Sequence, residues 1–116
     1  MIFADERLPL DLSERGIIAL AAFAHRGSAP PESQGFFYLL SPEFQKKTLQ
    51  LTGLLRIADG LDYLHLGTAL EVHCVIGEEE IACDVIASAD VSVEKQRARI
   101  KSDMFIRAFG RNLVIR

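Results

Sequence analysis

A change of hydrophobic period near Gly67 most constrains what this chain can fold into. Before that glycine, apolar residues recur every three to four positions, as in LLRIADGLDYLH (residues 54–65). After it, apolar residues alternate with their neighbours over residues 70–76 and again over 81–86. Helices bring every third or fourth residue to one face, whereas strands bring every second one there. The sequence therefore predicts a single domain with a helical part, residues 1–67, and a strand-containing part, residues 68–116.

Start and stop signals place a first helix early in the chain. Asp11 followed by Glu14 has the spacing of a capping box, in which the two residues cap each other. The helical pattern continues until Gly27, a typical stop residue. The stretch 28–32 contains two adjacent prolines, and proline lacks the amide hydrogen that a helix interior needs. This stretch is therefore predicted to be a loop.

A second, longer helix is expected after Ser41-Pro42, where a capping serine precedes a proline at the first helical position. A short helical turn over residues 36–40 is predicted to fill the gap between the two helices. The long helix is expected to end at about Leu66, before Gly67. Its predicted core-facing stripe consists of Leu51, Leu54, Leu55, Ala58 and Leu61.

The alternating segments predict a β-hairpin around the turn 77–80. The expected register pairs Ile76 with Ile81, Cys74 with Cys83 and His73 with Asp84. Both cysteines would then lie on the apolar face as buried small hydrophobes, which we favour over a redox pair or a metal site. The histidine and the aspartate would form a cross-strand polar pair.

A third helix is expected from Asp90 or Ser92 to Phe109, with Gly110 as its stop. Its predicted inner stripe consists of Val93, Ile100, Met104 and Ala108, flanked by Phe105 and Phe109. A last short strand over residues 113–115 would join the hairpin. The predicted fold class is α+β, with helices first and then a small antiparallel sheet covered by one helix.

Charge is distributed unevenly along the chain. Residues 1–90 carry 6 basic and 14 acidic side chains, a difference of −8, whereas residues 91–116 carry 7 and 2, a difference of +5. Such a cationic end suits a phosphate-rich partner, a partner surface or a solvated helix face. Aromatic residues do not interleave with the basic ones, so no specific nucleic-acid partner is expected.

Two further features bear on the compartment. No apolar run approaches the roughly 18 residues of a membrane span, so no membrane partner is expected. The two cysteines do not make a secreted disulfide framework, and a reducing cytoplasm is the predicted location.

The stretch 54–65 carries four polar residues at three-residue intervals, Arg56, Asp59, Asp62 and His65. Each step turns a helix by about 300°, so the four residues cover about half of its circumference and do not all face one ion. We expect neighbouring pairs to interact instead, Arg56 with Asp59 and Asp62 with His65. A role in binding an anion or a partner domain is the competing hypothesis for Arg56 or Asp59.

A metal-dependent phosphohydrolase of the HD type needs several converging His and Asp ligands, including an adjacent His-Asp pair. The chain has three histidines and no His-Asp dipeptide. His25 and Asp59 approach each other if the first two helices pack antiparallel, but two ligands do not complete a site. No catalytic residue, metal ligand or cofactor is therefore predicted. A divalent cation belongs only to an alternative in which the chain is a degenerate HD-type phosphohydrolase.

The order of several short motifs resembles the C-terminal HD-like region of the Ppx/GppA phosphatases, the exopolyphosphatase and guanosine pentaphosphate phosphohydrolase family. The motifs are Ile17-Ile18-Ala19 through His25-Arg26 with a following proline, LLRIADGLD (residues 54–62), Glu94, Lys101, Asp103, Phe105 and Phe109-Gly110. The likeness covers nearly the whole chain, and the LLRIADGLD block is its most specific part. The paired-histidine segment expected upstream is missing, so we expect either a domain fragment or a stand-alone relative.

The resemblance implies a vestigial HD-like helical part followed by a small α/β module. It also implies that hydrolysis belongs to N-terminal actin-like lobes, which this chain lacks. By position, Asp59 corresponds to the last aspartate of the HD-type metal set, and His25-Arg26 to the family's His-Arg pair. The implied function is that of an accessory domain, not catalytic alone, which aids binding of polyphosphate or guanosine polyphosphates and contributes domain or subunit contacts.

The predicted ligand-binding residues are His25, Arg26, Arg56, Asp59, Arg97, Arg99 and Lys101. The expected partners are polyphosphate or a guanosine polyphosphate, together with a second copy of the chain or the actin-like lobes. Besides the degenerate phosphohydrolase, one more alternative stays open, a purely structural dimerisation module. Its interface would be the hairpin or the stripe from Leu51 to Leu61.

Overall fold

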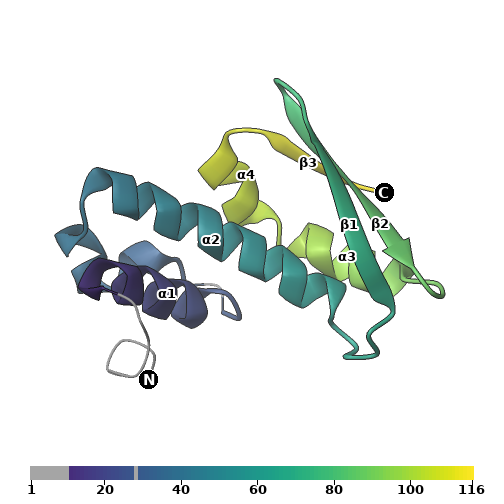
Figure 1. Cartoon of the computed structure of the whole chain (residues 1–116), viewed down its shortest axis with the longest axis horizontal. Helices are drawn as coiled ribbons and strands as arrows, with labels where there is room; N and C mark the ends of the chain where they lie inside the picture. The colour runs from purple at the N-terminus through teal and green to yellow at the C-terminus, as the bar shows by residue number, and fades with distance from the viewer. Residues whose placement is uncertain (1–10, 28) are drawn as a thin grey trace.

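A computed structural model describes residues 11–27 and 29–116, and its fold is α+β (Figure 1). The helical part contains α1 (Leu12–Ala24), the short 3₁₀ helices η2 (Pro31–Ser33) and η3 (Gly35–Leu39), and the long α2 (Pro42–Leu61). The following part contains β1 (Ala69–Ile76), β2 (Glu80–Ala87), α3 (Ser92–Ile100), α4 (Asp103–Phe109) and β3 (Asn112–Ile115). Within the described residues, no helix combines the length and the apolar character that a membrane crossing requires.

The predicted starts of the first two helices are confirmed. Asp11 accepts a hydrogen bond from the N–H of Glu14, and the Glu14 carboxylate accepts one from the N–H of Asp11, which completes the capping box. The hydroxyl of Ser41 accepts a hydrogen bond from the N–H of Phe44, and α2 begins at Pro42. These starts are local in sequence, which is why the pattern was sufficient to find them.

The connection between α1 and α2 matches the prediction in part. Ser28 of the predicted loop 28–32 lies outside the described residues, and the remainder contains the start of η2. The predicted turn over residues 36–40 is η3, in which Phe37 is buried.

The end of α2 is a correction, because the helix stops at Leu61 and not at Leu66. The N–H of Tyr63 bonds to the carbonyl of Gly60 at 3.1 Å, which tightens the last turn. Residues 62–67 are exposed, and a helical end without packing is marginally stable in water. The chain turns instead through His65, which has a positive φ of 55°.

The predicted third helix is two helices, because the chain breaks at Lys101-Ser102. The hydroxyl of Ser102 donates to the carbonyl of Arg99 at 2.7 Å and competes there with the helical hydrogen-bond ladder. Because of the break, α3 and α4 do not share one continuous buried face. Two predicted core positions, Val93 and Ile100, are therefore exposed. The buried residues of α3 and α4 are Glu94, Ala98, Met104 and Phe105.

The sheet is mixed, not antiparallel throughout, and has the order β1-β2-β3 (Figure 1). β1 and β2 are antiparallel in the predicted register, with Ile76 opposite Ile81, Cys74 opposite Cys83 and His73 opposite Asp84. β3 runs parallel to β2 because α3 and α4 form a crossover that returns the chain in the same direction. β1 is an edge strand. As a result Cys83 is buried but Cys74 is exposed, contrary to the prediction that both are buried.

The core lies between the sheet and the helices. One buried cluster contains Ile81, Cys83 and Phe105, and another contains Leu61, Ala98 and Ile115. Ile57 of α2 and Leu113 of β3 pack against both clusters. α2 contacts α1 as well as α3 and α4, so it is shared between the helical part and the strand-containing part.

Of the predicted leucine stripe of α2, only Leu61 is buried. Leu54 is 49% exposed and Ala58 is exposed, whereas Leu51 and Leu55 are half-buried. The buried residues are Thr48, Thr52, Gly53, Arg56, Gly60 and Leu61. Two of these are glycines at close backbone contacts. A Cβ at Gly53 would lie 2.7 Å from the Cα of Phe105, and a Cβ at Gly60 would lie 2.6 Å from the Cα of Ala98. Leucine side chains would hold α3 and α4 too far from α2 for these contacts.

Candidate functional site: a polar junction between the helices

The end of α1, the C-terminal half of α2 and the break between α3 and α4 bring charged residues together. We call this group the polar junction; its members are His25, Arg26, Arg56, Asp59, Lys101 and Asp103. Five of these are predicted ligand-binding residues. The aspartate at the start of α4 was part of the family resemblance but was not among the candidates.

Arg56 is the buried centre of the polar junction, and its side chain is only 8% exposed. Its Nη1 donates a hydrogen bond to the carbonyl of Gly27, just beyond α1. Its Nη2 donates to Asp103 Oδ1 at 3.2 Å, at the start of α4. The predicted pairing of Arg56 with Asp59 is therefore wrong. One planar guanidinium instead connects three helices, a task suited to its fixed fork of donors.

Asp59 is paired with Lys101, whose Nζ donates a hydrogen bond to Asp59 Oδ2. This hydrogen bond lowers the pKa of Asp59 below its ordinary value; partial burial opposes the shift, and the charges of Lys101 and the nearby Arg26 support it. The carboxylate is thus ionised at neutral pH. The pair fastens α2 to the α3–α4 break, one turn of helix away from Arg56.

His25 uses both of its ring nitrogens within α1's last turn. Nδ1 lies 2.7 Å from the carbonyl oxygen of Ala22, and Nε2 lies 3.3 Å from the Nε of Arg26. A carbonyl only accepts and a guanidinium only donates, so Nδ1 carries the proton and Nε2 accepts. This arrangement leaves no free lone pair for a metal ion. Among residues 11–27 and 29–116, no group of three or more His, Cys, Asp or Glu side chains has a metal-binding arrangement.

The side chains of the remaining two candidates, Arg97 and Arg99, have their partners outside the polar junction, although both backbone carbonyls accept a hydrogen bond from the N–H of Lys101. The guanidinium of Arg97 stacks over the ring of Tyr63, 4.3 Å from its centroid. Arg99 Nη2 donates to the carbonyl of Ile115 at 2.8 Å and so holds the end of β3. Both residues are nevertheless exposed, on the same helix that leads into Lys101.

Six of the seven basic side chains at the cationic end have partners within the protein, and three of these pair with carboxylates of the acidic body. Arg107 forms an ion pair with Glu32 at 3.0 Å, and Arg116 forms one with Asp84 at 3.0 Å. The predicted pair of His73 with Asp84 is therefore wrong at the side-chain level: His73 Nε2 lies 2.9 Å from Glu71. The predicted pair of Asp62 and His65 is confirmed at 3.3 Å. Most of the positive charge thus stabilises the fold.

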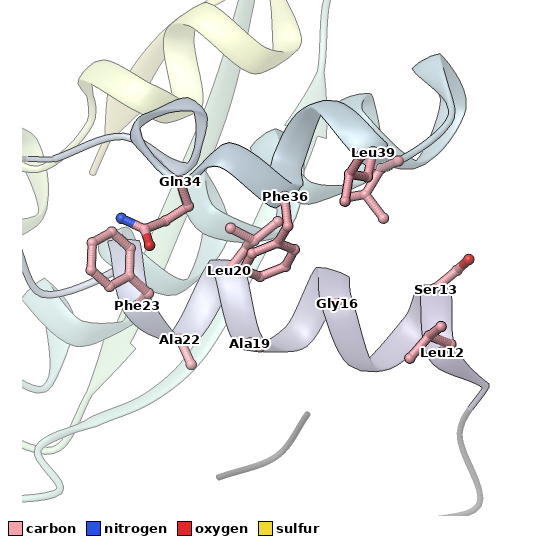
Figure 2. A pocket seen from close by; sticks show the side chains of 11 residues that line it. Leu12, Ser13, Gly16, Ala19, Leu20, Ala22, Phe23, Gln34, Phe36 and Leu39 are labelled. Atoms are coloured by element: carbon pink, nitrogen blue, oxygen red, sulfur yellow. The ribbon is translucent and has the colours of Figure 1, made fainter. Parts of the chain in front are cut away.

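A second surface feature was not predicted from the sequence. An open apolar groove of about 840 Å³ lies between α1 and the η2–η3 segment (Figure 2). Figure 2 shows Leu20 and Phe36 pointing toward one another along it, with Phe23 and the polar Gln34 toward one end. Leu39 at its rim is 86% exposed. An apolar surface of this size is typical of a contact with another protein surface or a ligand.

Two comparisons with known proteins were made to identify a family for this chain. A scan against models of protein families found no match, and a search of curated proteins found no match either. The function is therefore argued from the geometry of the polar junction and from the motifs that form it.

Proposed function

We propose that this chain is an accessory domain of an exopolyphosphatase- or guanosine pentaphosphate phosphatase-like protein. In this role it helps to bind a polyphosphate or a guanosine polyphosphate, contacts the catalytic lobes and does not hydrolyse phosphate alone. The supporting observation is convergence. Motifs that are far apart in the sequence, His25-Arg26, the LLRIADGLD block and the segment from Lys101 to Asp103, meet in the polar junction. Motifs selected together for one function are expected to meet in space.

Arg26 is the residue of the polar junction best placed to contact an anion. It is exposed, and its Nε contacts an imidazole and not a carboxylate. Arg56 and Lys101 are paired with Asp103 and Asp59, so their positive charges are balanced locally and they are not free to move toward a ligand. Arg97 and Arg99 add exposed positive charge on α3. A polyanion held by several exchangeable, charge-assisted contacts fits this arrangement better than a single deep pocket would.

Isothermal titration of the chain with linear polyphosphate, at low and at high salt, tests this proposal. We expect binding at low salt that weakens steeply as salt rises, because exposed charges are screened. Arg26→Ala should weaken the binding several-fold, and adding Arg97→Ala should weaken it further. Lys46→Ala is the matched control, since Lys46 is an exposed cation on α2 about 15 Å along the helix from Arg56. Equal losses for Arg26→Ala and Lys46→Ala, or binding without salt dependence, would contradict the proposal.

The degenerate metal-dependent phosphohydrolase has no observation in its favour. Its two candidate ligands are occupied, His25 by Ala22 and Arg26, and Asp59 by Lys101. Metal analysis of the purified chain and phosphate release from nucleotides with added manganese test this alternative. We expect no stoichiometric metal and no turnover.

The dimerisation module is favoured by one observation, the exposed apolar surface. The groove between α1 and η3 and the edge strand β1 both present large apolar side chains to solvent. Sedimentation velocity at tens of micromolar distinguishes the two functions. A dimer that dissociates in the variant Leu39→Ser would support the dimerisation module. If the chain is a monomer, the groove is instead available to contact the catalytic lobes.

A further inference from the structure

The two cysteines of the hairpin lie where a disulfide bond can form. Cys74 and Cys83 are directly opposite each other in the antiparallel pair, and their Sγ atoms are 2.8 Å apart. The N–H of Gly77 bonds to the carbonyl of Glu80 at 2.8 Å, which makes that pair a hydrogen-bonded one. Pairs alternate along the ladder, so three steps further the cysteines occupy a non-hydrogen-bonded pair, in which side chains approach most closely.

Backbone geometry therefore permits the bond without rearrangement. Cα atoms in a non-hydrogen-bonded pair are about 4.5 Å apart. Disulfides are found at Cα separations of about 4.4–6.8 Å. Side chains opposite each other also lie on the same face of the sheet, as the bond requires.

The two thiols differ in access. Cys74 is exposed on the edge strand, whereas Cys83 is only 7% exposed and packs with Ile81 and Phe105. Burial raises the pKa of the Cys83 thiol, and its hydrogen bond with Cys74 acts in the same direction. An outside reagent therefore meets Cys74 first, and Cys83 is held beside it as a second thiol.

We propose that Cys74 and Cys83 form a reversible, redox-sensitive disulfide that joins β1 to β2, with small-molecule disulfides as the oxidant. The thiolate of Cys74 attacks one sulfur of the small disulfide, the S–S bond breaks, and one small thiolate leaves. The thiolate of Cys83 then attacks Cys74 Sγ and displaces the second small thiolate. The protein loses two protons and two electrons, and the oxidant becomes two thiols.

The bond would act on an edge strand of the sheet. β1 packs mainly against β2, and residues 70–76 are exposed. Val72 and Ile76 share the face of Cys74 and are exposed. A link at Cys74 fixes this apolar face in place, while its exposure keeps the bond accessible to reduction, as in labile and regulatory disulfides. The inference rests on the hairpin alone and does not depend on the proposed function.

Oxidised glutathione added to the full chain, followed by alkylation and mass spectrometry, tests the proposal. We expect loss of both free thiols, a mass lower by two hydrogens, no bound glutathione, and full reversal by a reductant. The product should remain a single chain at every dilution, because the second step is intramolecular. Hydrogen exchange of the β1 amides should slow in the oxidised protein, since the strand then opens less often.

Three variants, in which each new side chain is close in size to the one that it replaces, serve as controls. Cys83→Ser should stop at the glutathione adduct on Cys74, and Cys74→Ser should leave Cys83 unmodified. The double change Cys74→Ser with Val75→Cys keeps two thiols but moves one to the opposite face of β1, so the intramolecular bond should not form. The proposal is overturned if the wild-type chain keeps two alkylatable thiols, ends as an adduct or a linked dimer, or oxidises no better than the double variant.

Discussion

The two faces of α2 reverse the usual distribution of polar and apolar residues. The buried residues are Thr48, Thr52, Gly53, Arg56, Gly60 and a single leucine, Leu61. Leu54 and Ala58 lie in solvent. Hydrophobic character alone would have chosen the other orientation. The comparison shows that close approach of neighbouring backbones, and not the number of leucines, selects the face that this helix buries.

The buried threonine hydroxyls carry little penalty because their hydrogen bonds are made. The hydroxyl of Thr48 donates to the carbonyl of Phe44 at 2.7 Å, and that of Thr52 donates to the carbonyl of Thr48 at 2.8 Å. Burying a satisfied hydroxyl costs far less than burying an unpaired one. The threonines therefore act as small, well-packed residues, which lets α2 lie close to its neighbours.

The largest expected effect comes from filling the closest backbone contact. In Gly60→Ala the new Cβ would lie 2.6 Å from backbone atoms of Ala98, which cannot move as a flexible side chain does. We expect a loss of about 2–3 kcal/mol in the free energy of unfolding, measured by chemical denaturation. This outweighs the gain of about 1 kcal/mol that alanine normally brings to a helix interior.

Gly35→Ala is the matched control, because nothing lies within 4 Å of a Cβ at that position. We expect its free energy of unfolding to change by less than about 0.5 kcal/mol. If Gly60→Ala were as mild as this control, the close packing of the buried face of α2 would be wrong.

The next effect concerns the charged residue of the buried face. Arg56→Met keeps a flexible apolar chain of similar length but removes the hydrogen bond to the carbonyl of Gly27 and the ion pair with Asp103. We expect a loss of about 1–3 kcal/mol in the free energy of unfolding, because the carbonyl loses its donor in a partly buried place.

Asp103→Asn separates the two contributions of Arg56. The Asp103 side chain is 67% exposed, so water replaces the lost pairing, and we expect a change below about 1 kcal/mol in chemical denaturation. A loss as large as that of Arg56→Met would show that the ion pair, and not the bond to Gly27, connects the helices.

The sequence predicts contacts between residues that are close in sequence better than contacts between residues that are far apart in it. The capping box at Asp11 and the hairpin register around Cys74 and Cys83 depend on neighbours in sequence, and both are confirmed. The partners of Arg56 and Asp59 lie 47 and 42 residues further along the chain, so their three-residue spacing suggested the wrong pair. The α3–α4 break has one local signal, the serine at 102, which is too common to predict it alone.

A smaller effect compares one residue from each face of α2 directly. Thr52 is fully buried, whereas Leu54 is half exposed. Thr52→Ala should lower the free energy of unfolding by about 1 kcal/mol, through a lost methyl group and a lost hydrogen bond. Leu54→Ala should lower it by less than about 0.5 kcal/mol, although it removes more carbon atoms. Parallel chemical denaturation of both variants checks the order, and a larger loss for the leucine would restore the predicted stripe.

The smallest effect lies at the boundary between the two faces, where the Asp59 side chain is 29% exposed. Its pKa is lowered in the folded chain by Lys101, so ionised Asp59 stabilises the fold above the ordinary value of 3.8 and this contribution disappears as the pH falls through the lower, folded pKa. Asp59→Asn should therefore cost less than about 1 kcal/mol at neutral pH, and its difference from the wild type should shrink below about pH 4. Chemical denaturation of both proteins between neutral pH and about pH 3 measures this difference, and the lowered pKa of Asp90 cancels because both proteins share it. A difference that stayed constant with pH would mean that Asp59 contributes by shape and not by charge, and the polar junction would then be fastened by Arg56 alone.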